Sequence, residues 1–148
     1  MILPVTLTIA AAAAVVNLWL AFRIVPIRVK DKVLVGDNGN ALLQGRMRAH
    51  ANFTEYAPFI LILLGLIELA GGSTMWLWIA GVVFVIARVA HAFGMDRATS
   101  SLPRAGGALV TWALMAVLAC WALAIAYQAN SVLPAAKTFQ VVPSGGRA

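Results

Sequence analysis

The sequence predicts an all-α membrane protein that folds as a bundle of four transmembrane helices. Of its 148 residues, 62% are hydrophobic and only 11% are charged, against about 25% charged residues in a typical soluble domain. Its mean hydropathy is +0.90. A soluble globule of this size needs more polar side chains on its surface, and a disordered chain is poorer in apolar residues. An integral membrane protein with one small domain is therefore the predicted class.

Four apolar segments are each long enough to cross a hydrocarbon core of about 30 Å. We predict helices at about residues 2–27, 41–70, 74–96 and 104–132. Because the backbone must satisfy its own hydrogen bonds in lipid, these segments are expected to be helical, and the absence of period-two alternation argues against a β-barrel. Residues 1–133 then form the membrane domain, and residues 134–148 form a polar C-terminal tail.

The connections between the segments predict how the helices follow one another. The first segment is followed by a basic flank, which indicates a retained helix and not a cleaved signal peptide. Residues 36–40 of the first connection have the composition of a turn. Residues 71–73 predict a tight antiparallel turn, and residues 95–104 form the last connection.

Basic residues are unevenly distributed and predict the orientation in the membrane. The two longer connections and their flanks hold eight of them, whereas residues 71–73 hold none. These eight are Arg23, Arg28, Lys30, Lys32, Arg46, Arg48, Arg97 and Arg104. The positive-inside rule places both connections in the cytoplasm and both termini on the non-cytoplasmic side.

The remaining composition excludes several other classes of function. The net charge of +6 reports topology in a membrane protein, so we expect no nucleic acid as a partner. The single Cys120 cannot form an internal disulfide, and no metal-binding pattern is present, so we expect no metal.

The second apolar segment contains polar residues at helical spacing. Arg48, Asn52 and Glu55 lie at i, i+4 and i+7, so they share one face of a helix. Pro58 lacks an N–H for the carbonyl of Thr54 and is expected to kink the helix. Taken separately, Arg48 also fits a residue that extends to the headgroups, and Asn52 fits a hydrogen bond between helices.

The third segment repeats this pattern with Arg88, His91 and Met95 at i, i+3 and i+7. Charged groups at this depth are costly in lipid, so they are expected to face the bundle interior or a polar cleft. An ion pair between Arg88 and Glu55 that only joins the helices remains an alternative. We interpret Glu68, near the outer end of its helix, as an interfacial side chain.

Two of these segments resemble signatures of a known family. The run from Arg48 through Asn52 and Glu55 to Pro58 resembles the second-helix signature of the MAPEG family, the membrane-associated proteins in eicosanoid and glutathione metabolism. Arg88-Val89-Ala90-His91 resembles the third-helix signature of the same family. The resemblance extends to about residue 132 and suggests a bacterial-type member.

The resemblance implies a homotrimer that binds glutathione between neighbouring subunits. It assigns the contacts with glutathione to residues of helices 2 and 3, namely Arg48, Asn52, Glu55, Tyr56, Arg88 and His91. A basic residue at the end of helix 1 contributes from the neighbouring subunit in some members. Arg28 is the match for it, with Arg23 as the alternative. Met95 stands where several eicosanoid-producing members have Tyr, a departure that argues against eicosanoid synthesis.

The start of helix 4 carries the predicted catalytic residue. Ser101, Pro103 and Arg104 follow the pattern of a cap, a proline in the first turn and then a basic residue. In catalytic members an Arg at this position stabilises the glutathione thiolate, and Arg104 matches it. Arg97 is the second choice, and Ser100 or Ser101 can add a hydroxyl donor. A simple cytoplasmic anchor is the alternative role for Arg104.

The leading hypothesis is therefore a glutathione-dependent transferase or peroxidase in a bacterial inner membrane, active on lipophilic electrophiles in detoxification. Glutathione is the expected co-substrate, and apolar residues of helices 3 and 4 are expected to bind the lipophilic substrate. The alternative is a non-catalytic trimeric scaffold that binds a lipid or a thiol. A small transporter subunit is a third class, but the sequence shows no inverted repeat.

Overall fold

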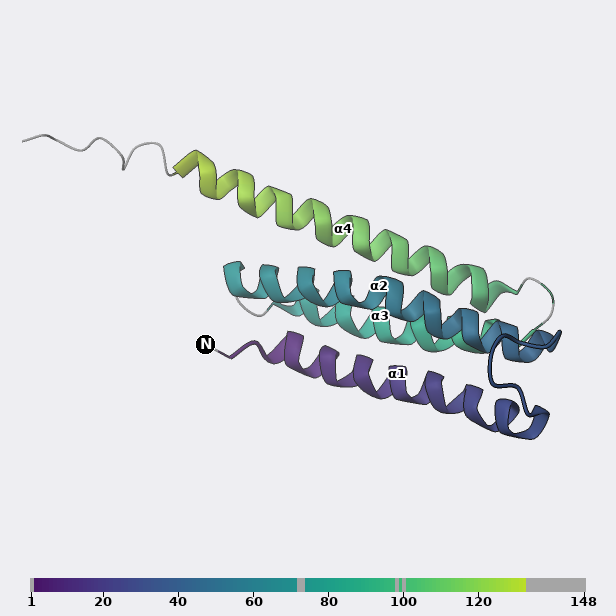
Figure 1. The fold of residues 1–148 in the computed structure, drawn as a ribbon. Coiled ribbons are helices and arrows are strands. Elements are labelled where there is room, and N and C mark those ends of the chain that lie inside the picture. The colour runs from purple at the N-terminus through teal and green to yellow at the C-terminus, as the bar shows by residue number, and fades with distance from the viewer. Residues whose placement is uncertain (1, 72–73, 98, 100, 133–148) are drawn as a thin grey trace, which may run out of the picture.

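The computed structural model describes residues 2–71, 74–97, 99 and 101–132, and these residues form four α-helices (Figure 1). The helices are α1 (Pro4–Asp31), α2 (Ala41–Gly71), α3 (Met75–Gly94) and α4 (Leu102–Val132). Each is long and apolar enough to cross a membrane. The all-helical class and the four predicted spans are therefore confirmed.

The helix boundaries differ from the predicted ones mainly at the end of α1. The sequence predicts an end near residue 27, but α1 continues through Pro26 to Asp31. Proline removes one hydrogen-bond donor, which bends or weakens a helix without always ending it. The helix ends at Lys32, whose φ of 52° is in the left-handed region. The predicted positions of Gly72 and Ser73 in a turn, and of the tail at 134–148, fall outside the described residues.

Side chains close the N-termini of two helices. The Asn40 side chain accepts a hydrogen bond from the Leu43 N–H at 3.0 Å, before the first turn of α2. The Thr74 hydroxyl accepts one from the Leu77 N–H at 3.3 Å, at the start of α3. Asn and Thr are favoured at these positions because they satisfy N–H groups that have no partner inside the helix.

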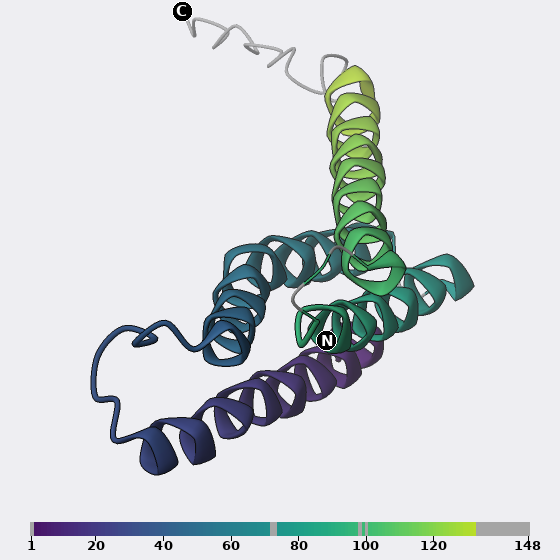
Figure 2. The same cartoon turned by 90° about the vertical axis from the view of Figure 1, so that its right-hand side faces the viewer.

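α4 packs mainly against α3 and also contacts α2, and it diverges from the other helices toward its C-terminal end. Figures 1 and 2 show α4 close to the others near residue 102 and farther away toward residue 132. In the described part of α4, only Gly107, Thr111 and Leu118 are buried. Most of α4 therefore presents an apolar surface to lipid or to another protein chain.

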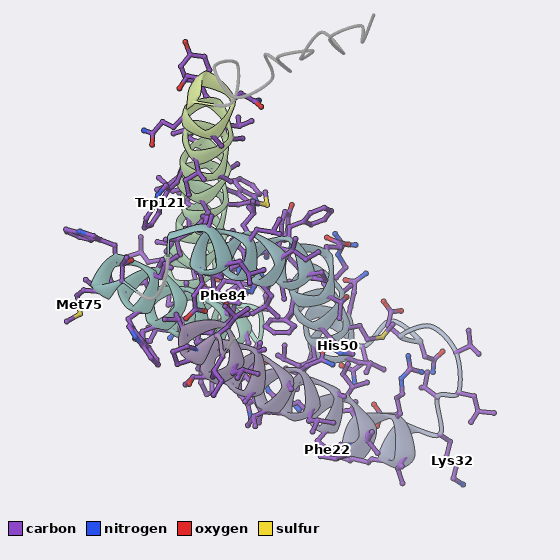
Figure 3. All side chains as sticks on the ribbon, turned by 90° about the vertical axis from the view of Figure 1, so that its left-hand side faces the viewer. Phe22, Lys32, His50, Met75, Phe84 and Trp121 are labelled. Atoms are coloured by element: carbon purple, nitrogen blue, oxygen red, sulfur yellow. The ribbon has the colours of Figure 1, made fainter. Side chains whose placement is uncertain are left out.

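The core is formed mainly by apolar side chains that α1, α2 and α3 turn toward one another, and α4 adds Leu118. Phe84 of α3 is fully buried, and its ring stacks on that of Phe53 of α2 with centroids 6.2 Å apart. Figure 3 shows Phe84 among the packed helices, with Met75 and Lys32 at opposite ends of the bundle. Gly81 lets α3 approach Ile9 of α1, because a Cβ atom there would overlap the isoleucine side chain.

Glu68 joins α2 to the beginning of α1. Its carboxylate accepts hydrogen bonds from the Val5 N–H at 2.9 Å, the Thr6 N–H at 2.8 Å and the Thr6 hydroxyl at 2.7 Å. The side chain is only 2% exposed. A carboxylate here satisfies N–H groups of the first turn and complements the positive end of the helix dipole. Glu68 therefore has a structural role at this end of the bundle, where its side chain is buried between α1 and α2.

Candidate functional site

Arg88 of α3 is the centre of a buried polar cluster that joins three helices. It is 1% exposed, and its Nη2 donates to the Asn52 side-chain oxygen of α2 at 2.8 Å. Its Nη1 lies 3.5 Å from the Thr111 hydroxyl oxygen of α4, which in turn donates to the Gly107 carbonyl at 2.8 Å. The guanidinium also lies 5.9 Å from the centre of the Phe53 ring. Thr111 looks like an ordinary helix residue in the sequence, so its role appears only in three dimensions.

This cluster decides between two alternatives that the sequence leaves open. The partner of Arg88 in α2 is Asn52, so Asn52 does make a hydrogen bond between helices. Among the described residues, the structure contains no ion pair between Arg88 and Glu55. Within the described part of the chain, the Nε atom of Arg88 is buried without a hydrogen-bond partner, so these residues do not fully satisfy the guanidinium.

Arg48 and Glu55 lie on the outer surface of α2, beside this cluster. Both side chains are exposed, and neither takes part in an ion pair within the described part of the chain. Tyr56 is half-buried, and its ring meets that of Trp112 of α4 edge-on, with centroids 6.5 Å apart. The predicted polar face of α2 thus has Asn52 turned inward and two charged groups turned outward.

His91 holds the beginning of α4 against the end of α3. Its Nδ1 donates to the Arg104 carbonyl oxygen at 2.8 Å, and the ring is 5% exposed. Gly94 and Gly107 make this close approach possible, because a Cβ atom on Gly94 would overlap the Arg104 backbone and one on Gly107 would overlap Ala87 and His91. The backbone of Arg104 is therefore fixed while its side chain is exposed.

The other candidates near the start of α4 are placed differently. The Ser101 hydroxyl donates to the Gly94 carbonyl at 3.1 Å and so caps the end of α3. Arg97 is exposed, and Met95 is half-buried. Ser100 lies outside the described residues. Among the described candidates for the catalytic role, Arg104 is the one whose backbone is held by a hydrogen bond to a site residue, His91.

The two candidates at the end of α1 bind groups of their own chain. Arg28 donates to the Val33 and Leu34 carbonyls at 3.2 and 2.9 Å, and so holds the loop that follows α1. Arg23 pairs with Asp96, which also accepts from Arg46 Nε at 3.2 Å. Across the described residues, no hydrogen bond or ion pair joins either candidate to the cluster around Arg88.

Two further polar contacts near these candidates were not foreseen from the sequence. His50 donates from Nε2 to the Asn17 side-chain oxygen at 2.9 Å, joining α2 to α1. Asp96 joins α1 and α2 through Arg23 and Arg46. The partners are 33 to 73 residues apart in the chain, so no local pattern identifies them. Among the described residues, no group of His, Cys, Asp and Glu is suitable for a metal ion.

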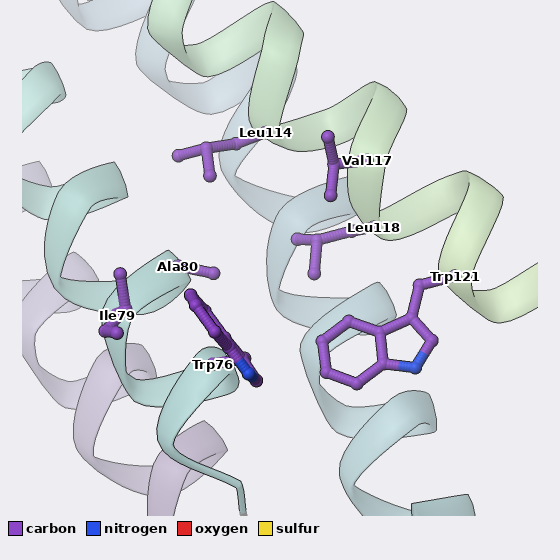
Figure 4. Close-up of a pocket in the computed structure, with 7 residues that line it drawn as sticks. All are labelled: Trp76, Ile79, Ala80, Leu114, Val117, Leu118 and Trp121. Carbon is purple, nitrogen blue, oxygen red and sulfur yellow. The ribbon is translucent and has the colours of Figure 1, made fainter.

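An apolar groove follows the line between α3 and α4. A cavity of about 420 Å³ lies at its far end, lined by Trp76, Ile79, Ala80, Leu114, Val117, Leu118 and Trp121 (Figure 4). A second cavity of about 280 Å³ lies nearer the start of α4, lined by Val83, Ile86, Ala87, Ala90, Pro103, Gly106, Gly107 and Val110. These residues recur every three or four positions on both helices, so the two cavities lie on the same side of the helix pair. The groove reaches Pro103, next to Arg104.

Comparison with known proteins shows the family of the chain. A model of the MAPEG family matches residues 6–124, a range that includes every candidate site residue. Two relatives, each named inner membrane protein YecN, come from Escherichia coli strain K12 and Escherichia coli O6:H1. Each is 31% identical over 109 residues, which cover 74% of this chain and 82% of the relative. With the four spans, this similarity identifies a multi-pass integral protein of the inner membrane.

Proposed function

The chain belongs to the MAPEG family, and from this we propose that it is a membrane-bound, glutathione-dependent transferase or peroxidase for lipophilic electrophiles. We further propose a homotrimer with both termini on the non-cytoplasmic side. Glutathione binds between neighbouring copies at the basic end of the bundle, the end that carries Arg23, Arg28, Arg46, Arg48, Arg97 and Arg104.

The observation that carries the proposal is the exposed charge on a membrane-spanning helix. Glu55 lies about 21 Å along α2 from its first residue, at 1.5 Å per residue, and its side chain is exposed. A carboxylate at this depth is costly in contact with lipid. A polar ligand together with a neighbouring copy of the chain would remove both Glu55 and Arg48 from lipid.

The chemical groups of this surface complement those of glutathione. Glutathione carries two carboxylates, one ammonium and one thiol. The exposed Arg48 offers a guanidinium fork to a carboxylate, and Glu55 offers an acceptor to the ammonium. Arg88 is buried, and it fixes the side chain of Asn52, which is turned inward beside the exposed Arg48 and Glu55. Its unpartnered Nε atom leaves one donor for a bound acceptor.

Arg104 is the proposed catalytic residue. When bound, glutathione supplies a thiolate whose sulfur attacks the electrophile. The exposed Arg104 guanidinium stands in the first turn of α4, where its charge and the positive helix end both favour a thiolate over a thiol. His91 positions this turn through the Arg104 carbonyl. Arg28 is the proposed contribution of the neighbouring copy, and it must leave the loop carbonyls to reach that ligand.

The groove between α3 and α4 is the proposed site for the lipophilic substrate. Its lining is almost entirely apolar, and it extends from Trp76 and Trp121 to Pro103, beside the proposed thiolate. A substrate dissolved in the bilayer can therefore lie along the groove with its reactive end near Arg104.

Turnover of a generic electrophile with glutathione tests the proposal. We predict that Arg104→Ala abolishes turnover while glutathione binding, measured by calorimetry in detergent, is retained. Lys30→Ala is the matched control, because it removes an exposed basic residue at the same end of the bundle. Loss of activity in Arg97→Ala but not in Arg104→Ala would transfer the role to Arg97. A wild-type protein without turnover would favour the non-catalytic scaffold.

A further inference from the structure

A second apolar groove, between α1 and α3, leads to a charged cluster of Arg23, Arg46 and Asp96, to which the proposed function gives no contact with glutathione. The groove has a volume of about 370 Å³ and is lined by Val15, Val16, Trp19, Val89 and Phe93. The next turn of α1 beyond Trp19 carries Arg23, and the residue three positions after Phe93 is Asp96. The groove and the charged cluster thus follow one another along α1 and along α3 with the residues just after it.

The charged cluster has an excess of positive charge. Arg23 and Arg46 both pair with the single carboxylate of Asp96, which leaves a net charge of +1. The Arg23 Nη1 atom is buried without a hydrogen-bond partner among the residues that the structure describes, and one Arg46 donor is used by the Arg23 carbonyl at 2.7 Å. The cluster therefore has more donors than acceptors, and an additional anionic acceptor would satisfy it.

The same aromatic residues belong to the groove and to the cluster. The Arg23 guanidinium lies 4.6 Å from the centre of the Trp19 ring and 5.5 Å from that of Phe93, and both rings line the groove. The apolar lining is thus continuous with the cationic end. This arrangement matches an amphiphile with an anionic head and an apolar chain.

We propose that this groove and cluster bind an anionic glycerophospholipid. Its acyl chain lies against Trp19 and Phe93 between α1 and α3, and its phosphate accepts hydrogen bonds from Arg23 and Arg46. Basic pockets between transmembrane helices bind anionic headgroups in this way. A zwitterionic lipid has the same chain and phosphate, but its own cation competes with the guanidinium groups, so the site prefers the anionic lipid.

Native mass spectrometry of the full-length protein in detergent tests this proposal, with phosphatidylglycerol and phosphatidylcholine of identical chains as probes. We expect the wild type to retain phosphatidylglycerol preferentially. Arg23→Gln should reduce this retention at least about tenfold, since it removes one charge-assisted interaction. Lys30→Gln is the matched control, because it removes the same charge from an exposed position on α1, and it should retain the lipid.

A second pair of variants tests the groove without changing the cluster. Val15→Trp places an indole in the groove and should reduce phosphatidylglycerol retention, whereas Leu18→Trp, at an exposed position of α1 outside the groove, should not. If Arg23→Gln fails to fold, the comparison of Val15→Trp with Leu18→Trp still tests the proposed lipid site. Equal retention of both lipids by the wild type would overturn the proposal. The proposal would also be overturned if the two variants of each pair reduced phosphatidylglycerol retention equally. Complete displacement of the lipid by inorganic phosphate would overturn it too, because it would indicate a simple anion site.

Discussion

At the level of single residues, the structure assigns partners to polar side chains that the sequence places only on a helix. Asn52 and Arg88 were both predicted as site residues, and they are hydrogen-bonded to each other. The pattern in the sequence indicates that the two side chains lie at the same depth in the membrane. It does not show that Asn52, and not Glu55, is the partner of Arg88, because that depends on a small rotation of α2 about its axis.

Glu68 is a second polar side chain whose hydrogen-bond partners cannot be identified from the sequence. Its partners Val5 and Thr6 are more than 60 residues away in the chain. A lone Glu near a helix end is consistent with an interfacial side chain or with a cap on another helix. Only the packing of α1 beside α2 distinguishes the two.

The contacts of Glu68 lead to a stability prediction. We expect Glu68→Gln to lower the free energy of unfolding in detergent by about 1–3 kcal/mol, because the amide group cannot accept from all three donors and leaves a buried donor unsatisfied. Thr6→Val should have a smaller effect, because it removes the hydroxyl donor alone. Thr8→Val, at an exposed position two residues after Thr6, is the control. Equal stability of Glu68→Gln and the wild type would contradict this role.

At the level of elements, the apolar runs of the sequence predict the four helices directly, but they predict the ends of the helices less accurately. A run of apolar residues in lipid must be helical, so the four spans were predictable. The end of α1 was not, because Pro26 is compatible both with a helix end and with a helix that continues. The loss of one donor there was not enough to end the helix before Asp31.

The contact between α3 and α4 depends on glycines whose role is visible only in three dimensions. Gly106 and Gly107 are adjacent in α4, but a Cβ atom on Gly107 would overlap the Ala87 carbonyl and His91, whereas one on Gly106 would meet open space. The sequence gives no reason to distinguish them. Gly107 is the position that keeps the first turn of α4, and hence Arg104, against His91.

This difference predicts opposite effects of the same substitution at neighbouring positions. Gly107→Ala should destabilise the protein by about 1–3 kcal/mol through overpacking, and it should lower turnover because Arg104 moves. Gly106→Ala should stabilise it by up to about 1 kcal/mol, since alanine is the better helix former. Unfolding in detergent and turnover with glutathione measure both effects. Similar behaviour of the two variants would show that the helices are not in close contact here.

At the level of the whole molecule, the charges and the exposed apolar surface support the same proposal. The few charged residues gather near the basic end, where several are paired within the chain and others, such as Arg48 and Glu55, are exposed. The largely exposed α4 and the charged outer face of α2 favour an assembly of several copies. The composition predicted a membrane protein. Which charged side chains are paired within the chain and which are exposed could be learned only from the structure.

The central claim is that this membrane domain binds glutathione and holds it as the thiolate. Titration of the purified protein in detergent with glutathione, followed by the ultraviolet absorbance of the thiolate near neutral pH, tests it most directly. We predict a saturable thiolate signal for the wild type, unchanged in Lys30→Ala and absent in Arg104→Ala although glutathione still binds. The absence of a thiolate signal in the wild type at saturating glutathione would contradict the claim.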